Sequence, residues 1–78
     1  MHFLLFTTTT CPKCPAFKEF VAENIDFDGE ILDETNPGFS EKIAESGVTV
    51  APAILIFEDG KEIFRTGEVS ELQDFLKA

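Results

Sequence analysis

The chain has 78 residues, of which 44% are hydrophobic and nine are Phe, and its formal net charge is −9. This length suits one domain, residues 1–78, and the hydrophobic content argues against disorder. The negative charge disfavours nucleic acid and anionic membrane surfaces as partners. No apolar segment reaches the roughly 18 residues of a membrane span, and the N-terminus lacks the pattern of a signal peptide. We therefore expect a cytoplasmic monomer that does not associate with membranes.

The first half of the chain predicts a strand, a helix and a weak second strand. Residues 2–6 are an apolar run with the length of a buried strand, and residues 7–10 form a polar loop. A helix should begin at the cysteines that follow, because Pro12 and Pro15 are tolerated only in the first turn of a helix. The inward stripe of this helix consists of apolar side chains at helical spacing, namely Phe17, Phe20 and Val21. The weak strand is expected over residues 30–33.

A second helix and the strongest strand of the chain come next. Asn36 suits the N-cap of the helix and Pro37 its first position, while Gly47 should mark its C-terminal end. The apolar face of this helix should consist of Phe39, Ile43 and Ala44. Residues 53–57 have the continuous apolar character that is typical of a strand buried on both faces.

The remaining chain predicts a hairpin and a last helix. Asp59-Gly60 favours a tight turn, and residues 61–66 return as a strand. Ser70 and Gln73 have the spacing of a capping box for the last helix. That helix presents Leu72, Phe75 and Leu76. The order β-α-β-α-β-β-α indicates an α/β fold in which four strands form one mixed sheet with helices on both faces.

Cys11 and Cys14 have the spacing of a redox-active Cys-x-x-Cys pair. Thiol–disulfide exchange needs a thiolate as nucleophile and a second thiol that resolves the mixed disulfide. A helix N-terminus stabilises negative charge, which should lower the pKa of Cys11 below its free value of about 8.5. Cys14 would lie one turn deeper and be shielded. We therefore predict that Cys11 attacks and Cys14 resolves, with Pro12 stiffening the loop. Lys13 either adds a cation that favours the thiolate or is a solvated surface lysine.

Two other roles of the cysteine pair remain open at this stage. The pair could be a permanent structural disulfide, or half of a metal site. Zinc requires four ligands, and the chain offers two Cys and one His. His2 begins the first strand whereas the cysteines follow its far end, so a metal site would need a homodimer bridged through the cysteines of two chains. A non-catalytic interaction module of the same fold is a further alternative.

With these motifs placed, the chain resembles the thioredoxin and glutaredoxin superfamily over nearly its whole length. Cys-Pro-Lys-Cys at residues 11–14 is similar to a glutaredoxin site. Residues 47–61 resemble thioredoxin, with a Gly-Val pair, a proline that opens an apolar strand and a turn containing Gly. Residues 66–76 are similar to the thioredoxin C-terminal region. The resemblance implies a minimal thioredoxin fold and a thiol–disulfide oxidoreductase, an electron carrier of cell redox homeostasis without bound cofactor or metal.

The resemblance also implies how a client protein would bind. Pro52 would be the cis-proline of the family, facing the cysteine pair. The backbone beside it would pair with an extended client chain, and Ala51 would offer a small surface next to Cys11. The substrate-binding residues implied in this way are Pro12, Lys13, Ala51, Pro52 and Gly67.

Several residues depart from the family pattern. Thr10 stands where thioredoxins carry Trp, and Leu5 stands where they bury an acid. Glutaredoxins that use glutathione carry an aromatic residue at the position of Lys13 and a Gly-Gly pair at Gly67-Glu68. Because glutathione is anionic, Glu68 and the net charge of −9 disfavour it.

We therefore predict that a protein disulfide reductase, rather than glutathione, recycles the chain. The clients would be proteins that contain disulfides. Small carriers of this kind resemble the hydrogen donors of ribonucleotide reductase, which is one client among others that the residues do not distinguish. A glutathione-dependent glutaredoxin is the nearest alternative.

Overall fold

A computed structural model describes residues 1–77 of the chain. Its elements are β1 (His2–Phe6), α1 (Cys14–Asn24), β2 (Gly29–Leu32), α2 (Phe39–Ser46), β3 (Ala53–Glu58), β4 (Lys61–Thr66) and α3 (Val69–Lys77). The strands form one sheet in the order β2-β1-β3-β4, in which β1 and β2 are parallel and the other pairs antiparallel. The predicted element order and mixed sheet are confirmed.

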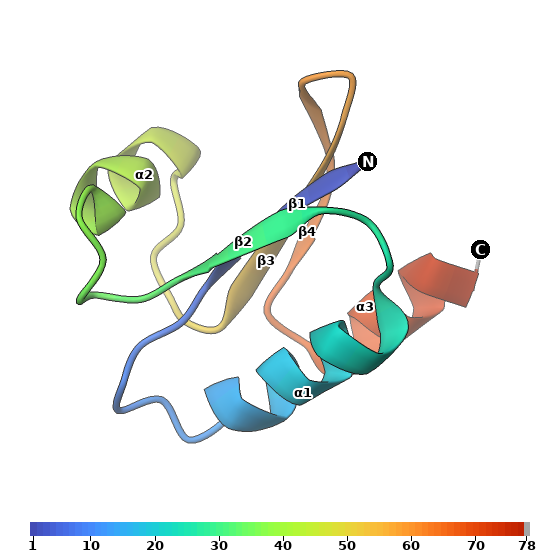
Figure 1. Ribbon diagram of the computed structural model, residues 1–78, viewed down its shortest axis with the longest axis horizontal. Coiled ribbons are helices and arrows are strands. Elements are labelled where there is room, and N and C mark those ends of the chain that lie inside the picture. The colour runs from blue at the N-terminus through green and yellow to red at the C-terminus, as the bar shows by residue number, and fades with distance from the viewer. Residues whose placement is uncertain (78) are drawn as a thin grey trace.

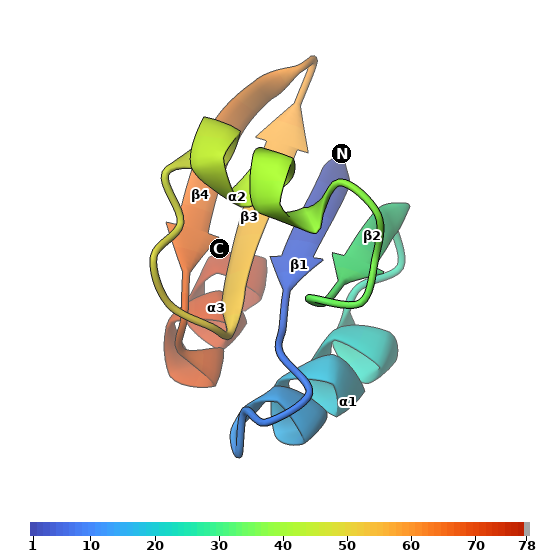
Figure 2. The same ribbon diagram turned by 90° about the vertical axis from the view of Figure 1, so that its left-hand side faces the viewer.

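The sheet separates two layers of helices, as predicted. Helices α1 and α3 lie on one face of the sheet, and α2 lies on the other (Figures 1 and 2). Each face has its own hydrophobic cluster. The first contains the buried Leu5, Phe17 and Leu72, and the second contains the buried Phe6 and Leu55. Within the described residues, no helix has the length and apolar character needed to cross a membrane.

Strand β3 is buried on both faces, because it lies inside the sheet with helices on either side. Its residues Ala53 to Ile56 are each less than 10% exposed, which confirms the interpretation of this apolar run. The strand continues to Glu58, one residue further than predicted. The predicted Asp-Gly turn is also confirmed, since Asp59 and Gly60 have φ angles of 54° and 78° and Glu58 pairs with Lys61.

Strand β2 spans Gly29–Leu32 and so lies one residue earlier than predicted. Gly29 pairs with Phe3 of β1, whose ring lies so close that a Cβ at position 29 would collide with it. The missing side chain of Gly29 therefore allows the buried Phe3 to pack across the parallel pair.

Helix α1 begins at Cys14, with Lys13 at its N-cap and Pro15 in its first turn. The helix therefore starts at the second cysteine rather than at both, because Cys11 and Pro12 precede it. Of the two prolines, only Pro15 lies in the first turn as predicted, and Cys14 is the first helical residue rather than one turn deeper. Phe17 and Val21 are 1% and 3% exposed and pack in the first cluster, as predicted for the inward stripe. Phe20, the third member of the stripe, is partly buried against the same cluster.

The predicted start of α2 is wrong. The helix begins at Phe39, with Gly38 at its N-cap in the left-handed region at φ 80°. Asn36 is used differently, because its Oδ1 accepts the backbone N–H of Asp33 at 2.8 Å and closes a turn before the helix. Gly47 ends the helix as predicted, at φ 74°. Ala44 is exposed rather than part of the apolar face.

The predicted capping box of α3 is also wrong. The helix begins at Val69, so Ser70 lies inside its first turn. Thr66, at the end of β4, organises this end of the chain instead. Its hydroxyl accepts the backbone N–H of Glu68 at 3.1 Å and donates to the carboxylate of Glu71.

Candidate active site

Cys11 and Cys14 form a disulfide, with their Cα atoms 5.4 Å apart. Cys11 lies in the loop between β1 and α1, and Cys14 is the first residue of α1. The pair therefore sits where the chain leaves the sheet and enters the helix. Pro15 has no N–H for the carbonyl of Cys11, four residues earlier, and its ring would clash with that carbonyl, so the helix cannot begin any earlier.

The two sulfurs differ in their exposure. Cys14 is 1% exposed and belongs to the core, whereas Cys11 is partly exposed. The backbone N–H of Cys14 donates to Sγ of Cys11 at 3.1 Å. In the reduced protein a thiolate at Cys11 can accept the same N–H, and a charged acceptor makes this hydrogen bond stronger. The geometry therefore stabilises negative charge on the sulfur that is partly exposed to solvent.

A pocket of about 340 Å³ lies beside the cysteines, between the start of α1 and the start of α3. Four of the predicted substrate-binding residues line it: Pro12, Lys13, Pro52 and Gly67. The Ala51–Pro52 peptide bond is cis, as the resemblance implied. Ala51 is not among the residues that line this pocket, although it is bonded to one of them. The fold thus brings three separate segments of the chain to one place beside Cys11.

The pocket also contains residues that the sequence did not mark as part of a site. Phe17 contributes to its wall, although the helical spacing identified it only as a core residue. The other additional lining residues are Ala16, Val69 and Ser70, and Glu68, which the sequence marked as unfavourable for glutathione, lines the pocket as well. Lys13 and Glu68 carry opposite charges on different elements of this pocket, and they form no ion pair within residues 1–77. Both side chains are exposed to solvent.

Leu5 occupies the place on β1 where the family pattern has a buried acid. It is fully buried, in the same cluster as Phe17 and Val21 of α1. An apolar residue cannot accept a proton, so Leu5 takes no part in deprotonating Cys14. Within the described residues, no group of three His, Cys, Asp or Glu side chains could hold a metal ion.

Gly67 lies against the backbone of Pro52. A Cβ at position 67 would lie 2.8 Å from the carbonyl oxygen of Pro52, closer than such atoms pack. We expect Gly67→Ala to lower the free energy of unfolding by about 1–3 kcal/mol, because the β4–α3 connection must move away from Pro52. Urea unfolding measures the change, with Ser70→Ala as a control from the same pocket. A stability equal to that of the wild type would contradict the close contact.

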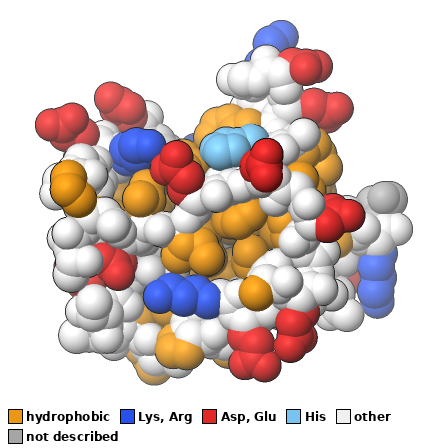
Figure 3. All heavy atoms as spheres, viewed as in Figure 1, with side chains coloured by type: hydrophobic (Ala, Val, Ile, Leu, Met, Phe, Trp, Pro, Cys, Tyr) orange, Lys and Arg blue, Asp and Glu red, His pale blue; other side chains and the backbone are white. Residues whose placement is uncertain are grey.

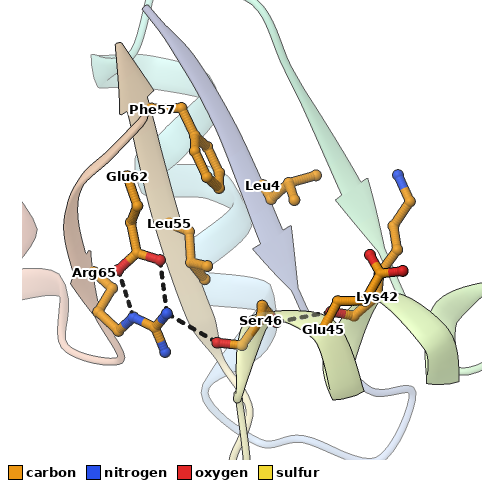
Figure 4. Close-up of a pocket in the computed structure, with 8 residues that line it drawn as sticks. All are labelled: Leu4, Lys42, Glu45, Ser46, Leu55, Phe57, Glu62 and Arg65. Atoms are coloured by element: carbon orange, nitrogen blue, oxygen red, sulfur yellow. Dashed lines mark hydrogen bonds and ion pairs between the residues drawn. The ribbon is translucent and has the colours of Figure 1, made fainter. Parts of the chain in front are cut away.

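A second pocket of about 340 Å³ lies on the α2 face of the sheet, away from the cysteines. Its floor consists of Leu4, Leu55 and Phe57, and Arg65 lies at its edge (Figure 4). The Arg65 guanidinium donates twice to Glu62, at 2.6 and 2.7 Å, which lowers the pKa of Glu62 and raises that of Arg65. This cation is already paired, and no residue of the Cys-x-x-Cys segment 11–14 lines this pocket. Pro12 and Lys13 of that segment line the pocket between α1 and α3, which is therefore the candidate active site.

Among the comparisons with known proteins, those with solved structures identify the fold. No family model matches the chain. Over 59 aligned residues the chain is 29% identical to an uncharacterised protein of Treponema pallidum (strain Nichols). The aligned residues are 74% of this chain and 77% of that protein.

Among solved structures, thioredoxin O2 of Arabidopsis thaliana in its oxidised state aligns with a TM-score of 0.79 at 20% identity, over 97% of this chain and 71% of that one. Thioredoxin 1 of Thermosipho africanus aligns with a TM-score of 0.72 at 20% identity, over 99% and 88% of the two chains. A thioredoxin f2 in complex with ferredoxin:thioredoxin reductase aligns with a TM-score of 0.71, at 20% identity over 97% and 74%. The chain has the thioredoxin fold, with a Cys-x-x-Cys pair joined as a disulfide.

Proposed function

We propose that this protein is a thiol–disulfide oxidoreductase that reduces disulfides of client proteins through Cys11 and Cys14. The observation that carries the proposal is the asymmetry of the pair. Cys11 is partly exposed and its sulfur accepts an N–H of α1, whereas Cys14 is 1% exposed directly behind it. This is the arrangement that a nucleophile and a resolving thiol require.

The reaction consists of two exchange steps. The Cys11 thiolate attacks one sulfur of a client disulfide, which breaks that bond and leaves a mixed disulfide and a client thiolate that takes up a proton. Cys14 then loses its proton and attacks Sγ of Cys11, releasing the second client thiolate. The client gains two electrons and the chain ends with the Cys11–Cys14 disulfide. A dithiol reductant of the cell must return the two electrons.

The reduction potential of the pair tests this proposal. The chain would be equilibrated with a series of redox buffers, and the fraction of oxidised cysteines determined by thiol labelling and mass spectrometry. A two-electron couple at roughly −230 mV or below would identify a cytosolic reductant, which is the role and location that we propose. A value near about −120 to −180 mV would instead indicate an oxidant or isomerase. A chain without a reversible couple would contradict the proposal altogether.

We further propose that a protein disulfide reductase recycles the chain. The thioredoxin f2 with the same fold was solved together with ferredoxin:thioredoxin reductase, which shows that this fold can dock on such an enzyme. The clients would be proteins with accessible disulfides, ribonucleotide reductase among them. Acidic side chains surround the hydrophobic middle of the face in Figure 3. With a net charge of −9, the surface favours a reductase or client with a basic docking face.

Glutathione should be a poor reductant of this protein. Glu68 lines the pocket beside Cys11 and repels a ligand of negative charge. We expect Glu68→Lys to raise the rate of reduction by glutathione about two- to fivefold, since an exposed charge contributes about 0.2–1 kcal/mol. The gain should shrink at high salt, because salt screens exposed charges.

Glu23→Lys is the matched control for this measurement. It makes the same change of charge at an exposed position of α1 outside the pocket. An equal gain in both variants would mean that only the net charge acts. If glutathione alone turned the wild-type protein over as fast as a protein reductase does, the chain would be a glutathione-dependent glutaredoxin.

A further inference from the structure

The backbone of Cys11 is held by a turn that comes directly after β1. The N–H of Cys11 donates to the carbonyl oxygen of Thr8 at 3.4 Å, so that Thr9 and Thr10 are the central residues of the turn. Thr7, one residue earlier, is fully buried, and its N–H and hydroxyl both donate to the carbonyl of Leu32. The turn thus begins at a fixed point on the sheet and ends at the nucleophile.

A carboxylate from a distant segment holds the middle of this turn. Oε1 of Glu34 accepts the backbone N–H of Thr9 at 2.8 Å. Within residues 1–77 this is the one hydrogen bond that joins residues 8–10 to another segment of the chain. Glu34 therefore fixes the turn, and through it the position of Cys11.

Glu34 is itself presented by an ordered turn. The N–H of Asn36 donates to the carbonyl of Asp33 at 3.0 Å, and the side-chain oxygen of Asn36 accepts the N–H of Asp33 at 2.8 Å. Oδ1 of Asp33 accepts the N–H of Thr35 at 2.8 Å. The hydroxyl and N–H of Thr35 both donate to Oδ1 of Asp33, which lowers the pKa of this carboxyl. The backbone of Glu34 thus lies inside a closed turn that aims its side chain at Thr9.

We propose that Glu34 is a positioning residue for Cys11, a role that rests on the proposed function. On one side of Cys11, helix α1 fixes the N–H that its sulfur accepts. On the other side, the hydrogen bond from Thr9 N–H to Glu34 fixes the turn whose backbone carries the sulfur. Without this hydrogen bond the turn samples other geometries, and Sγ of Cys11 spends less time within reach of the Cys14 N–H. The thiolate then loses stabilisation, so fewer molecules carry it at neutral pH and attack slows.

The pH dependence of thiol alkylation tests this role. Reduced protein would be treated with iodoacetamide from pH 5 to 10, and mass spectrometry would follow the label on Cys11. We expect Glu34→Ala to move the midpoint upward and to slow alkylation at pH 7 by about threefold or more, which corresponds to about half a pKa unit. Glu34→Gln keeps an oxygen that can accept the Thr9 N–H, so it should stay within about twofold of the wild type. Urea unfolding would verify that each variant is folded.

Two further variants complete the design. Glu34→Asp keeps the charge and the turn but is one methylene shorter, so it should behave like Glu34→Ala. Glu23→Ala removes an exposed carboxylate of α1 and should leave the profile unchanged. A wild-type profile for Glu34→Ala would overturn the proposal. Glu34→Gln as slow as Glu34→Ala would also overturn it, because the charge rather than the hydrogen bond would then act. Failure of the proposed function would appear separately, as a wild-type protein that does not exchange disulfides.

Discussion

Replacement of Cys11 by Ser is expected to reduce the turnover of client disulfides to the background rate. Cys11 is the partly exposed sulfur of the pair, and a serine hydroxyl supplies no thiolate. Cys14 cannot replace it, because its side chain is 1% exposed and faces the core. The measurement is the steady-state reduction of a disulfide-containing protein by the chain and a dithiol reductant.

Replacement of Cys14 by Ser should give a different result. Cys11 still attacks, but the mixed disulfide has no internal thiol that resolves it. We expect a covalent adduct between chain and client that accumulates under non-reducing conditions and disappears with dithiothreitol. The adduct would also identify clients. Equal activity of the wild type and the Cys11→Ser variant would instead indicate a non-catalytic interaction module.

The largest loss of stability is expected from Phe17→Ala. Phe17 is 1% exposed and packs α1 against the sheet, beside Leu5 and Leu72. Truncation of such a buried aromatic residue costs about 3–5 kcal/mol. Proteins have about 0.05–0.15 kcal/mol of stability per residue, so a chain of 78 residues has roughly 4–12 kcal/mol in all. The variant should therefore lose at least about a quarter of that stability and unfold at a clearly lower urea concentration than the wild type.

Urea unfolding followed by circular dichroism measures this loss. Ile63→Ala is a suitable control, since its side chain lies on β4 and is 44% exposed. The control should lose less than about 1 kcal/mol, because little apolar area is removed from the core. If both variants lost the same free energy, Phe17 would not have the central place in the core that its burial indicates.

The elements of this fold could be predicted because each carries a local signal. A few consecutive residues were enough to predict three of these features, namely strand β3, the Asp59-Gly60 turn and the end of α2 at Gly47. The errors occurred where two local signals competed. Asn36 can cap a helix or close a turn, and it closes a turn because the Asp33 N–H lies within its reach. Ser70 can cap a helix, but α3 already begins at Val69.

The candidate site was predictable only in part, for a related reason. The cysteine spacing is local, and the role of Pro52 followed from a resemblance rather than from its neighbours in sequence. The hydrogen bond between Glu34 and Thr9 joins residues 25 positions apart, and neither segment has a sequence pattern that predicts this contact. Glu68 and Lys13 likewise line one pocket only because the fold places the starts of α1 and α3 side by side. Contacts of this kind depend on the finished fold.

The strand order has a consequence for how the chain matures. Strand β1 is made first, yet one of its two neighbours is β3, so that His2 pairs with Phe57 and Phe6 with Ala53. During synthesis, the edge of β1 that pairs with β3 therefore stays without a partner until the β3–β4 hairpin has been made. Bringing β3 back to β1 closes a long loop, and only the contacts of the complete sheet compensate for the entropic cost. The cysteines, by contrast, are three residues apart and can be oxidised before the sheet exists. Their oxidation needs only the local chain, whereas the difference in exposure between Cys11 and Cys14 forms only when the fold is complete.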